Sequence, residues 1–271
     1  MKFLYHANCN DGTGAALAAW MAFGDDGHEY IPVQYGDQPP NISPGETVFI
    51  LDFSYPREAL REMADVAEDI IVLDHHKTAR DDLSAAFDEH NILAVFDMNK
   101  SGAVLAWERF HQDEPLPELF AYIQDRDLWR FDLEGTNEVS YGLSVFSEDF
   151  RHWAQLVRNP DFIRIRTRKD GRAIIRFLEL QAEKITATPP RVFEITGDEV
   201  PVYNLPGFML SDTLHLALET YPDAPYAVGY FDLPEKRVYS LRSRQGSDVD
   251  VSAIAKAHGG GGHKHAAGFS V

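Results

Sequence analysis

The sequence predicts a doubly wound α/β domain with a mostly parallel sheet, joined by a helical connector to a second, smaller α/β domain. In the first half, short apolar runs alternate with amphipathic stretches, as in βαβ units around a parallel sheet. A charged helical stretch at about 161–188 then ends at Pro189-Pro190, because the residue before a proline disfavours helix. The chain has 271 residues, which suits two domains of roughly 100–200 residues. We therefore expect domains at 1–155 and 191–271 and a connector at 156–190.

Each element follows from its local pattern. Apolar runs predict strands at 2–6, 30–34, 47–51, 70–73 and 92–96, and the stretches between them predict helices at 15–23, 57–67, 101–110 and 116–124. Beyond the connector, the same reasoning predicts strands at 191–196, 200–204, 226–232 and 237–242 and helices at 210–220 and 249–258. The chain then runs through a row of glycines at 259–262.

Composition limits the classes of function. The formal net charge of −18 repels long polyanions. Proteins that bind duplex DNA have a basic surface instead, which this composition does not favour. The single cysteine, Cys9, excludes an intramolecular disulfide, and the N-terminus has no signal-peptide pattern, so we expect a cytoplasmic protein. No apolar run approaches the roughly 20 residues of a membrane helix, and we expect no membrane partner.

Three of the predicted strands run directly into side chains that can bind metals. The carboxyl ends of parallel strands are where ligands bind in open α/β sheets. Taken singly, each of these residues has an ordinary explanation, such as a turn or helix cap. Taken together, they predict one site at one edge of the sheet. The residues concerned are His6, Cys9, Asp11, Asp52, Asp74, His75 and His76, with Asp125 and Asp127 after a later helix.

Mixed imidazole and carboxylate ligands suit Mn²⁺, Fe²⁺, Co²⁺ or Zn²⁺. Two such ions, roughly 3.5–4 Å apart, can assist an in-line displacement at phosphorus. Asp52 stands alone at a strand tip, where a carboxylate is a natural bridge between two ions. The pattern predicts a two-metal centre for hydrolysis at phosphorus.

The glycine row and the residues after it form a second candidate site. Successive glycines let backbone N–H groups approach an anion, and a helix N-terminus beside them would add positive potential. A flexible tail is the alternative, but Ala266-Ala267-Gly268-Phe269 is typical of a packed segment. Arg242 and Arg244 end a predicted strand, and either could bind phosphate or be a solvated strand end.

Two motifs in this chain occur in the order typical of one family: Asp74-His75-His76, and Gly259 to Phe269 with the letters GGGGHKHAAGF. The chain resembles a DHH-family phosphoesterase with a C-terminal DHH-associated substrate-binding domain. That family includes RecJ-like single-strand exonucleases, nanoRNA and pAp phosphatases, cyclic-dinucleotide phosphodiesterases and inorganic pyrophosphatases. The resemblance covers nearly the whole chain and implies a two-metal hydrolase, usually manganese-dependent.

The resemblance also implies roles for individual residues. Asp52 would bridge the ions, Asp74 would orient the site, and His76 would contact phosphate or support a ligand. The residues that would hold the metals are His6, Cys9, Asp11, Asp52, His75 and Asp125, with Asp127 as the rival of Asp125. The residues that would grip the far end of the substrate are Arg242, Gly261, Gly262 and His263.

Cys9 departs from the family pattern, because most relatives have an aspartate at that position. A thiolate is a softer ligand and shifts the preference toward Zn²⁺ or Fe²⁺. Alternatively, this metal site is weak and fills only with substrate. The identity of the metal therefore stays open between Mn²⁺, Zn²⁺, Fe²⁺ and Co²⁺.

We expect a metal-dependent phosphoesterase that acts as a phosphodiesterase, exonuclease or nucleotide phosphatase in a cleft between the domains. Its substrates would be nucleotides, short single-stranded oligonucleotides or cyclic dinucleotides, with no long duplex DNA as a partner. Two alternatives remain, a pyrophosphatase-like hydrolase of small phosphoanhydrides and a non-catalytic nucleotide-binding protein. The apolar residues of the connector helix are compatible with a homodimer.

Overall fold

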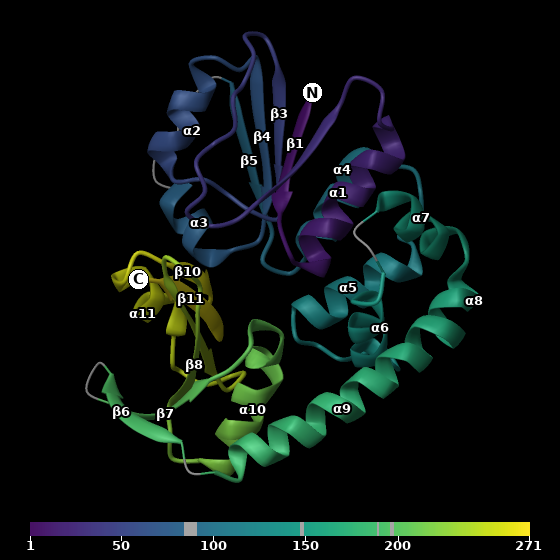
Figure 1. Cartoon of the computed structure of the whole chain (residues 1–271). Helices are drawn as coiled ribbons and strands as arrows, with labels where there is room; N and C mark the ends of the chain where they lie inside the picture. The colour runs from purple at the N-terminus through teal and green to yellow at the C-terminus, as the bar shows by residue number, and fades with distance from the viewer. Residues whose placement is uncertain (84–90, 147–148, 189, 196–197) are drawn as a thin grey trace. The chain divides into compact units, whose positions relative to one another are not determined.

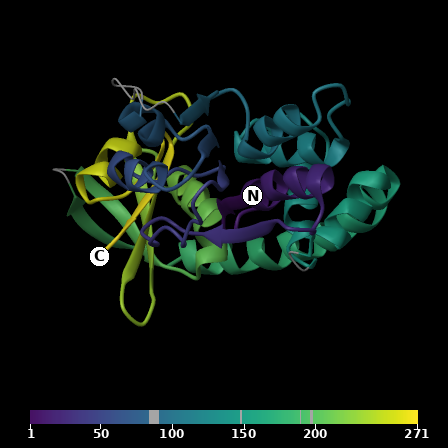
Figure 2. The same cartoon turned by 90° about the horizontal axis from the view of Figure 1, so that it is seen from above.

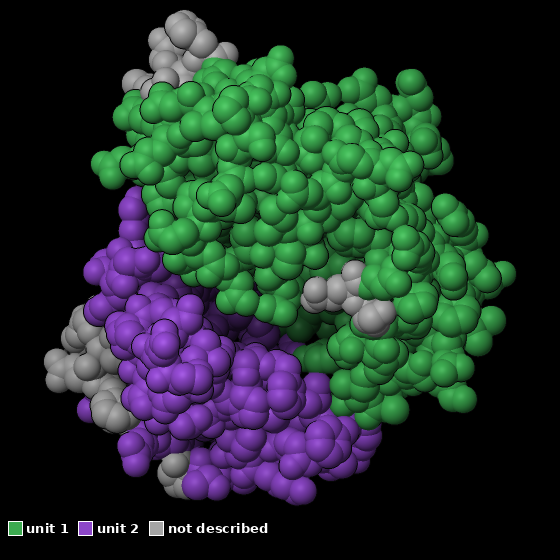
Figure 3. Space-filling model, turned by 45° about the horizontal axis from the view of Figure 1, so that its top comes forward, with its two compact units in different colours: residues 1–175 green, residues 176–271 purple. Residues whose placement is uncertain are grey.

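The computed structural model describes residues 1–83, 91–146, 149–188, 190–195 and 198–271. The chain divides into two compact units, Met1–Ile175 and Arg176–Val271 (Figure 3). This division falls inside the segment predicted as the connector, and the bounds at 155 and 190 stay predictions. No helix in the described ranges is long and apolar enough to cross a membrane.

Unit 1 is built on a parallel sheet with the strand order β2-β1-β3-β4-β5 among its described residues (Figure 1). The strands are β1 (Lys2–His6), β2 (Glu29–Val33), β3 (Thr47–Leu51), β4 (Asp69–Asp74) and β5 (Ile92–Phe96). After β2 the chain crosses to the other side of β1 to form β3, so the winding direction reverses between β1 and β3. Such a switch point opens a crevice at the carboxyl ends of the strands, where α/β proteins bind ligands.

Both faces of this sheet are covered, because successive strand residues point to opposite sides. Phe3 and Tyr5 pack with α1, α4 and α5 in one core, whereas Leu4 packs with α2 and α3 in another. Figures 1 and 2 show α2 and α3 on the opposite side of the sheet from α1. The helices of the first core are α1 (Asn10–Phe23), α4 (Gly102–Phe110), α5 (Glu118–Asp127), α6 (Thr136–Leu143) and α7 (Phe150–Arg158), and those of the second are α2 (Arg57–Ala64) and α3 (Lys77–Leu83). The doubly wound prediction is confirmed.

The segment after α7 is helical, as predicted for the connector. It contains α8 (Pro160–Phe162), the π-helical turn η1 (Ile163–Thr167) and α9 (Arg168–Thr186). The division between the two units falls within α9.

Unit 2 contains a mixed sheet with the order β10-β11-β9-β8-β7-β6 among its described residues. β7 and β8 pair in parallel, and the other neighbours are antiparallel. The strands are β6 (Arg191–Ile195), β7 (Asp198–Asn204), β8 (Tyr226–Asp232), β9 (Arg237–Ser243), β10 (Gly261–His263) and β11 (Ala266–Ser270). The helices are η2 (Gly207–Met209), α10 (Leu210–Thr220) and α11 (Val251–Ala257). The second α/β domain is thus confirmed as a fold.

Three helices of unit 1, α3, α6 and α7, are absent from the sequence prediction. They contain 7, 8 and 9 residues. An apolar pattern with a 3.6-residue period is hard to identify over so few residues, because it needs a window of about 11–18.

Candidate metal centre

The candidate site lies in unit 1 at the carboxyl ends of β1, β3 and β4. Leu51 of β3 pairs with both Tyr5 of β1 and Leu73 of β4, so these strands end at the same level of the sheet. His6 closes β1, Asp52 follows β3, and β4 ends in the Asp-His-His motif. The structure therefore brings together side chains that are far apart in the sequence, at the switch point of the sheet.

Asp52 turns sharply out of β3. Its φ is +57°, in the left-handed region that aspartate and asparagine tolerate better than most residues. Gly102 at the start of α4 permits this turn, since a Cβ there would lie 2.4 Å from Asp52 Cβ. Gly102 is not among the site residues predicted from the sequence. The available signal was Ser101-Gly102, a helix start that follows a strand.

The His75 imidazole lies among three carboxylates. Its Nε2 atom is 3.0 Å from Asp52 Oδ1 and 3.4 Å from both Asp11 Oδ2 and Asp127 Oδ2. His75, Asp11 and Asp52 are each 1% exposed. Oxygen and imidazole ligands gathered away from water form a set that fits a divalent cation.

The start of α4 holds the carboxylate of Asp11. The Gly102 N–H donates to Oδ2 over 2.6 Å and the Ala103 N–H donates to Oδ1 over 3.0 Å. These donors and the positive end of the helix dipole stabilise a negative charge at this position. The position of Asp11 beside His75 therefore depends on α4 as well as on its own helix, α1.

A second group of ligand atoms shares Asp52. His6, Cys9 and Asp52 each offer one ligand atom, and these atoms lie within 4.8 Å of one another. His6 Nδ1 is 3.6 Å from Asp52 Oδ2, whereas Oδ1 of the same carboxylate faces His75. The two oxygens of Asp52 thus face different groups, which is the arrangement that a bridging carboxylate requires.

Asp74 organises the Asp-His-His turn. Its Oδ1 accepts from the backbone N–H groups of His75 and His76 over 2.7 and 3.2 Å, and it lies 2.6 Å from His76 Nδ1. A proton on Nδ1 would complete that hydrogen bond and set the tautomer, with the lone pair of the neutral ring on Nε2. Asp74 and His76 are both buried, so the ring is held in one orientation.

Burial and the neighbouring charges shift pKa values in this cluster. Burial, together with the charges of Asp52 and Asp127, raises the pKa of Asp11 to about 7. Burial opposes ionisation of Asp52, but hydrogen bonds with His6 and His75 outweigh it and lower its pKa well below the usual value. Burial alone would lower the pKa of His6, yet its hydrogen bonds with Asp52 and Cys9 raise it to about 11. The pKa of His75 is also raised, by its carboxylate neighbours against burial.

Two carboxylate oxygens indicate that a cation belongs here. Oδ2 of Asp74 and Oδ2 of Asp127 are buried and accept no hydrogen bond within the described part of the chain. A buried acceptor without a donor costs about 1–3 kcal/mol. Divalent cations satisfy such oxygens, and the residues present therefore fit a metal.

The structure places Asp127, rather than Asp125, beside His75. Asp125 faces the loop after α5, where its Oδ1 accepts from the Asp132 N–H, and its Oδ2 accepts from the Leu133 N–H and the Thr136 hydroxyl. Helix α5 continues beyond its predicted end and includes both aspartates. Positions two apart on a helix point about 200° apart, so only one of the pair can face the cluster. The contacts favour Asp127, which the sequence analysis treated as the rival.

In unit 2, Arg242 and His263 lie on the same face of the sheet. Ala266 of β11 pairs with Arg242 of β9 on one side and with His263 of β10 on the other, and directly paired residues share a face. The Arg242 guanidinium donates to Ser240 Oγ over 2.9 Å and to Ser211 Oγ over 2.7 Å. Two of the predicted substrate-binding residues therefore share one face of the sheet, with β11 between their strands.

The glycine row does not form a single loop. Gly259 and Gly260 follow the C-terminal end of α11. Their N–H groups donate to carbonyls of its last turn over 3.1 and 2.9 Å. Gly261 and Gly262 belong to β10, where Gly262 has a φ of +137° and a Cβ would lie 2.6 Å from Ala266 O. The predicted helix N-terminus beside the row is wrong, because the adjoining helix presents its negative C-terminal end. The glycines instead permit a tight turn and a close strand pair.

Arg244 has a structural role. Its guanidinium donates to the carbonyls of Leu218, Tyr221 and Ala224 over 2.6, 3.0 and 2.7 Å. It therefore satisfies carbonyls at and after the C-terminal end of α10, and these contacts do not support the phosphate-binding hypothesis for this arginine. The sequence could not show this, because the direction of the side chain depends on how α10 packs.

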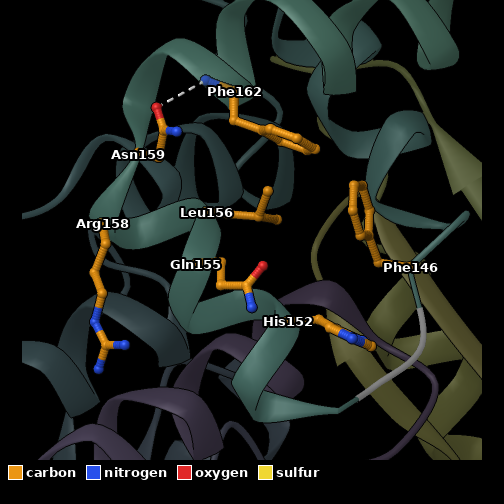
Figure 4. A pocket seen from close by; sticks show the side chains of 7 residues that line it. All are labelled: Phe146, His152, Gln155, Leu156, Arg158, Asn159 and Phe162. Carbon is orange, nitrogen blue, oxygen red and sulfur yellow. Dashed lines mark hydrogen bonds between the residues drawn. The ribbon is translucent and has the colours of Figure 1, made fainter.

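A separate pocket of about 320 Å³ lies in unit 1 at α7 and α8 (Figure 4). The rings of Phe146 and Phe162 form one wall, with centroids 6.1 Å apart. Its lining residues are Phe146, His152, Gln155, Leu156, Arg158, Asn159 and Phe162. With one imidazole and no carboxylate in its lining, the pocket lacks the ligand set of the metal centre.

Solved structures share the fold of this chain at low sequence identity. The pGpG-specific phosphodiesterase PggH from Vibrio cholerae is 15% identical with a TM-score of 0.54, and the match covers 100% of this chain and 92% of that chain. An exopolyphosphatase-related protein from Bacteroides fragilis is 13% identical with a TM-score of 0.53, over 99% and 85% of the two chains. RecJ from Thermus thermophilus, in complex with Mn²⁺, is 14% identical with a TM-score of 0.52, over 100% and 49%. The chain has the fold of the DHH-family phosphoesterases.

Among curated proteins, the chain is similar to the uncharacterized protein R106 of Acanthamoeba polyphaga mimivirus. The two are 32% identical over 289 aligned residues, which cover 98% of this chain. The chain spans 66% of the length of that relative. No protein-family model matches the chain.

Proposed function

We propose that the chain is a metal-dependent hydrolase of phosphate esters. The observation that carries the proposal is the set of Asp11, Asp52 and Asp127 carboxylates around His75 Nε2, at 3.0–3.4 Å, in which every side chain except the partly exposed Asp127 is buried. This set lies at the switch point of a parallel sheet. The fold shared with PggH and RecJ supports the reaction class.

The residues present would hold two divalent cations. One group consists of Asp11, Asp52, His75 and Asp127, and the other of His6, Cys9 and Asp52. Bound cations would supply Lewis-acid activation of water and neutralise charge at phosphorus. Manganese is what the family resemblance implies, and the Mn²⁺ complex of RecJ supports a divalent ion. Zn²⁺, Fe²⁺ and Co²⁺ also suit these ligands.

Asp74 and His76 would complete the site: Oδ1 of Asp74 positions His76, and its buried Oδ2 would be satisfied by a bound cation. Asp74 fixes the ring of His76 through Nδ1, so that Nε2 is oriented before the substrate binds. A neutral ring accepts a proton at Nε2 and a protonated ring donates one. We assign His76 the contact with a phosphoryl or leaving-group oxygen, and Asp74 the task of positioning it.

The substrates we propose are nucleotides, short single-stranded oligonucleotides or cyclic dinucleotides. The net charge of −18 opposes long polyanions, because repulsion grows with the number of phosphates. Arg242 and His263, on one face of the second sheet, are the proposed contacts to the far end of the substrate. Exonuclease activity, a homodimer and a cytoplasmic location stay predictions.

The test is turnover after reconstitution with each of Mn²⁺, Zn²⁺, Fe²⁺, Co²⁺ and Mg²⁺. The substrate panel contains a dinucleotide, a short and a long single-stranded oligonucleotide, pAp, a cyclic dinucleotide and pyrophosphate. Asp52→Asn is the inactivating variant, since asparagine tolerates a φ of +57° but lacks the charge. Asp113→Asn is the matched control, because Asp113 is exposed on the loop after α4.

We expect phosphate-ester hydrolysis that is lost in Asp52→Asn and kept in Asp113→Asn. Hydrolysis of pyrophosphate alone would support the phosphoanhydride alternative instead. Nucleotide binding without turnover, at every metal, would support the non-catalytic alternative. Activity that survives in Asp52→Asn would show that this cluster is not the active site.

A further inference from the structure

We infer that the metal centre contains two chemically different cation sites, one with a sulfur ligand and one with only oxygen and nitrogen ligands, separated by Asp52. The inference rests on the metal centre of the proposed function, but it does not depend on the substrate. It assigns a role to Cys9, the only cysteine of the chain.

The position of Cys9 is not explained by helix capping. Cys9 is the N-cap residue of α1, where serine, threonine, aspartate and asparagine are strongly preferred because they accept a backbone hydrogen bond. Its side chain accepts no such bond. The thiol lies instead with His6 and Asp52, whose ligand atoms are within 4.8 Å of it and of each other. A sulfur, an imidazole nitrogen and a carboxylate oxygen together are a ligand set typical of transition metals such as zinc.

The other half of the centre contains no sulfur. Asp11, Asp52 and Asp127 place oxygens at 3.4, 3.0 and 3.4 Å from His75 Nε2. Asp127 Oδ2 is buried and accepts no hydrogen bond from the described residues, so it is available to a cation. Three carboxylates and one imidazole suit harder ions such as Mn²⁺.

Asp52 keeps the two halves apart and gives one oxygen to each. Oδ2 lies 3.6 Å from His6 Nδ1 and Oδ1 lies 3.0 Å from His75 Nε2. The left-handed backbone at Asp52 and the close approach of Gly102 fix this orientation. The two cation sites therefore have different ligand atoms. We expect the site beside Cys9 to prefer Zn²⁺ and the site beside His75 to prefer Mn²⁺.

Cobalt titration of the metal-free protein tests this inference spectroscopically. A Co²⁺ ion bound to a thiolate absorbs in the near ultraviolet through sulfur-to-metal charge transfer, and in this chain only Cys9 can produce that band. We expect the band to reach its full height at about one equivalent of Co²⁺ per chain, while total binding continues to about two equivalents. Binding of Co²⁺ without the band would overturn the inference.

Two variants separate the sites. Cys9→Asp should bind as much cobalt as the wild type but lose the band, because a carboxylate replaces the sulfur and also caps α1. Asp127→Asn should keep the band and lose the second equivalent. Loss of the band in Asp127→Asn, with circular dichroism unchanged, would show a single shared site and contradict the inference.

Metal analysis of protein loaded with equal Zn²⁺ and Mn²⁺ provides a second measurement. We expect a higher ratio of zinc to manganese in the wild type than in Cys9→Asp, by a factor of about 10. An equal ratio in both proteins would contradict a sulfur site. A cobalt band without hydrolysis of any substrate would refute the proposed function and leave this inference intact. Hydrolysis without the band would refute this inference and leave the proposed function intact.

Discussion

Asp125 and Asp127 lie two residues apart on α5 and have different environments. Asp125 accepts three hydrogen bonds from the loop that leads to α6, whereas Asp127 Oδ2 is buried without a donor in the described structure. The first carboxylate therefore holds the loop in place, and the second is available to a metal.

Alanine substitutions at Asp125 and Asp127 should affect stability and metal binding differently. Asp125→Ala should lower the free energy of unfolding by about 2–4 kcal/mol, because three buried or partly buried donors lose their acceptor. Asp127→Ala should not lower the free energy of unfolding, because its Oδ2 accepts no hydrogen bond from the described residues, but it should weaken metal binding by at least about tenfold. Urea denaturation and calorimetric titration with Mn²⁺ measure the two effects. Equal losses of metal affinity in both variants would contradict the assignment.

The raised pKa values of His6 and Asp11 predict that metal binding releases protons. Their pKa values are raised to about 11 and about 7, so at pH 7 His6 carries a proton and Asp11 carries one in part of the molecules. A cation must displace these protons, and affinity should therefore rise with pH until the groups are deprotonated. Calorimetric titrations at pH 7, in buffers with different ionisation enthalpies, measure the number released. We expect more than one proton per chain, and a heat independent of the buffer would refute this.

The start of α4 links two parts of the candidate site. Its N–H groups hold Asp11, and Gly102 leaves room for Asp52. A helix that begins at this point therefore sets the positions of ligands from two different strand ends.

Gly102→Ala should disrupt the centre. Its Cβ would lie 2.4 Å from Asp52 Cβ, so either α4 or Asp52 must shift, and we expect a loss of metal affinity of at least about tenfold with lower stability. Gly207→Ala is the matched control, because its Cβ would meet Phe231 at an ordinary 3.4 Å. Metal titration and thermal unfolding of both variants test this. Wild-type affinity in Gly102→Ala would show that the contact is not limiting.

The strand ends could be predicted from the sequence, whereas the contacts between elements could not. His6, Asp52 and Asp74 each follow an apolar run, and the geometry of a parallel sheet then places them at one edge. The choice between Asp125 and Asp127 depends on the length and rotation of α5. The structural role of Arg244 depends on carbonyls at and after the end of α10. Such facts come from packing, which a local pattern does not contain.

The charge of the whole chain should affect the approach of the proposed substrates. With 43 acidic and 25 basic residues, the chain presents a negative field to any phosphate-containing molecule. Salt screens this repulsion, with a Debye length of about 10 Å at 0.1 M. The effect is opposite to that in most nucleic-acid-binding proteins, whose affinity falls as salt increases.

We therefore expect kcat/KM for an oligonucleotide substrate to stay constant or increase between about 50 and 200 mM NaCl. The increase should be larger for a longer oligonucleotide than for a dinucleotide, because more phosphates are repelled. Initial rates at low substrate concentration measure this. A decrease of tenfold or more would indicate a local basic surface that outweighs the net charge.

The left-handed backbone at Asp52 also has an evolutionary consequence. Of the side chains that tolerate a φ of +57°, asparagine has nearly the same shape as aspartate, and a single G-to-A transition converts either aspartate codon into an asparagine codon. A descendant with an intact fold and an uncharged bridge is thus one point mutation away. A relative of this chain with asparagine at position 52 should therefore keep the fold and lose the proposed hydrolysis.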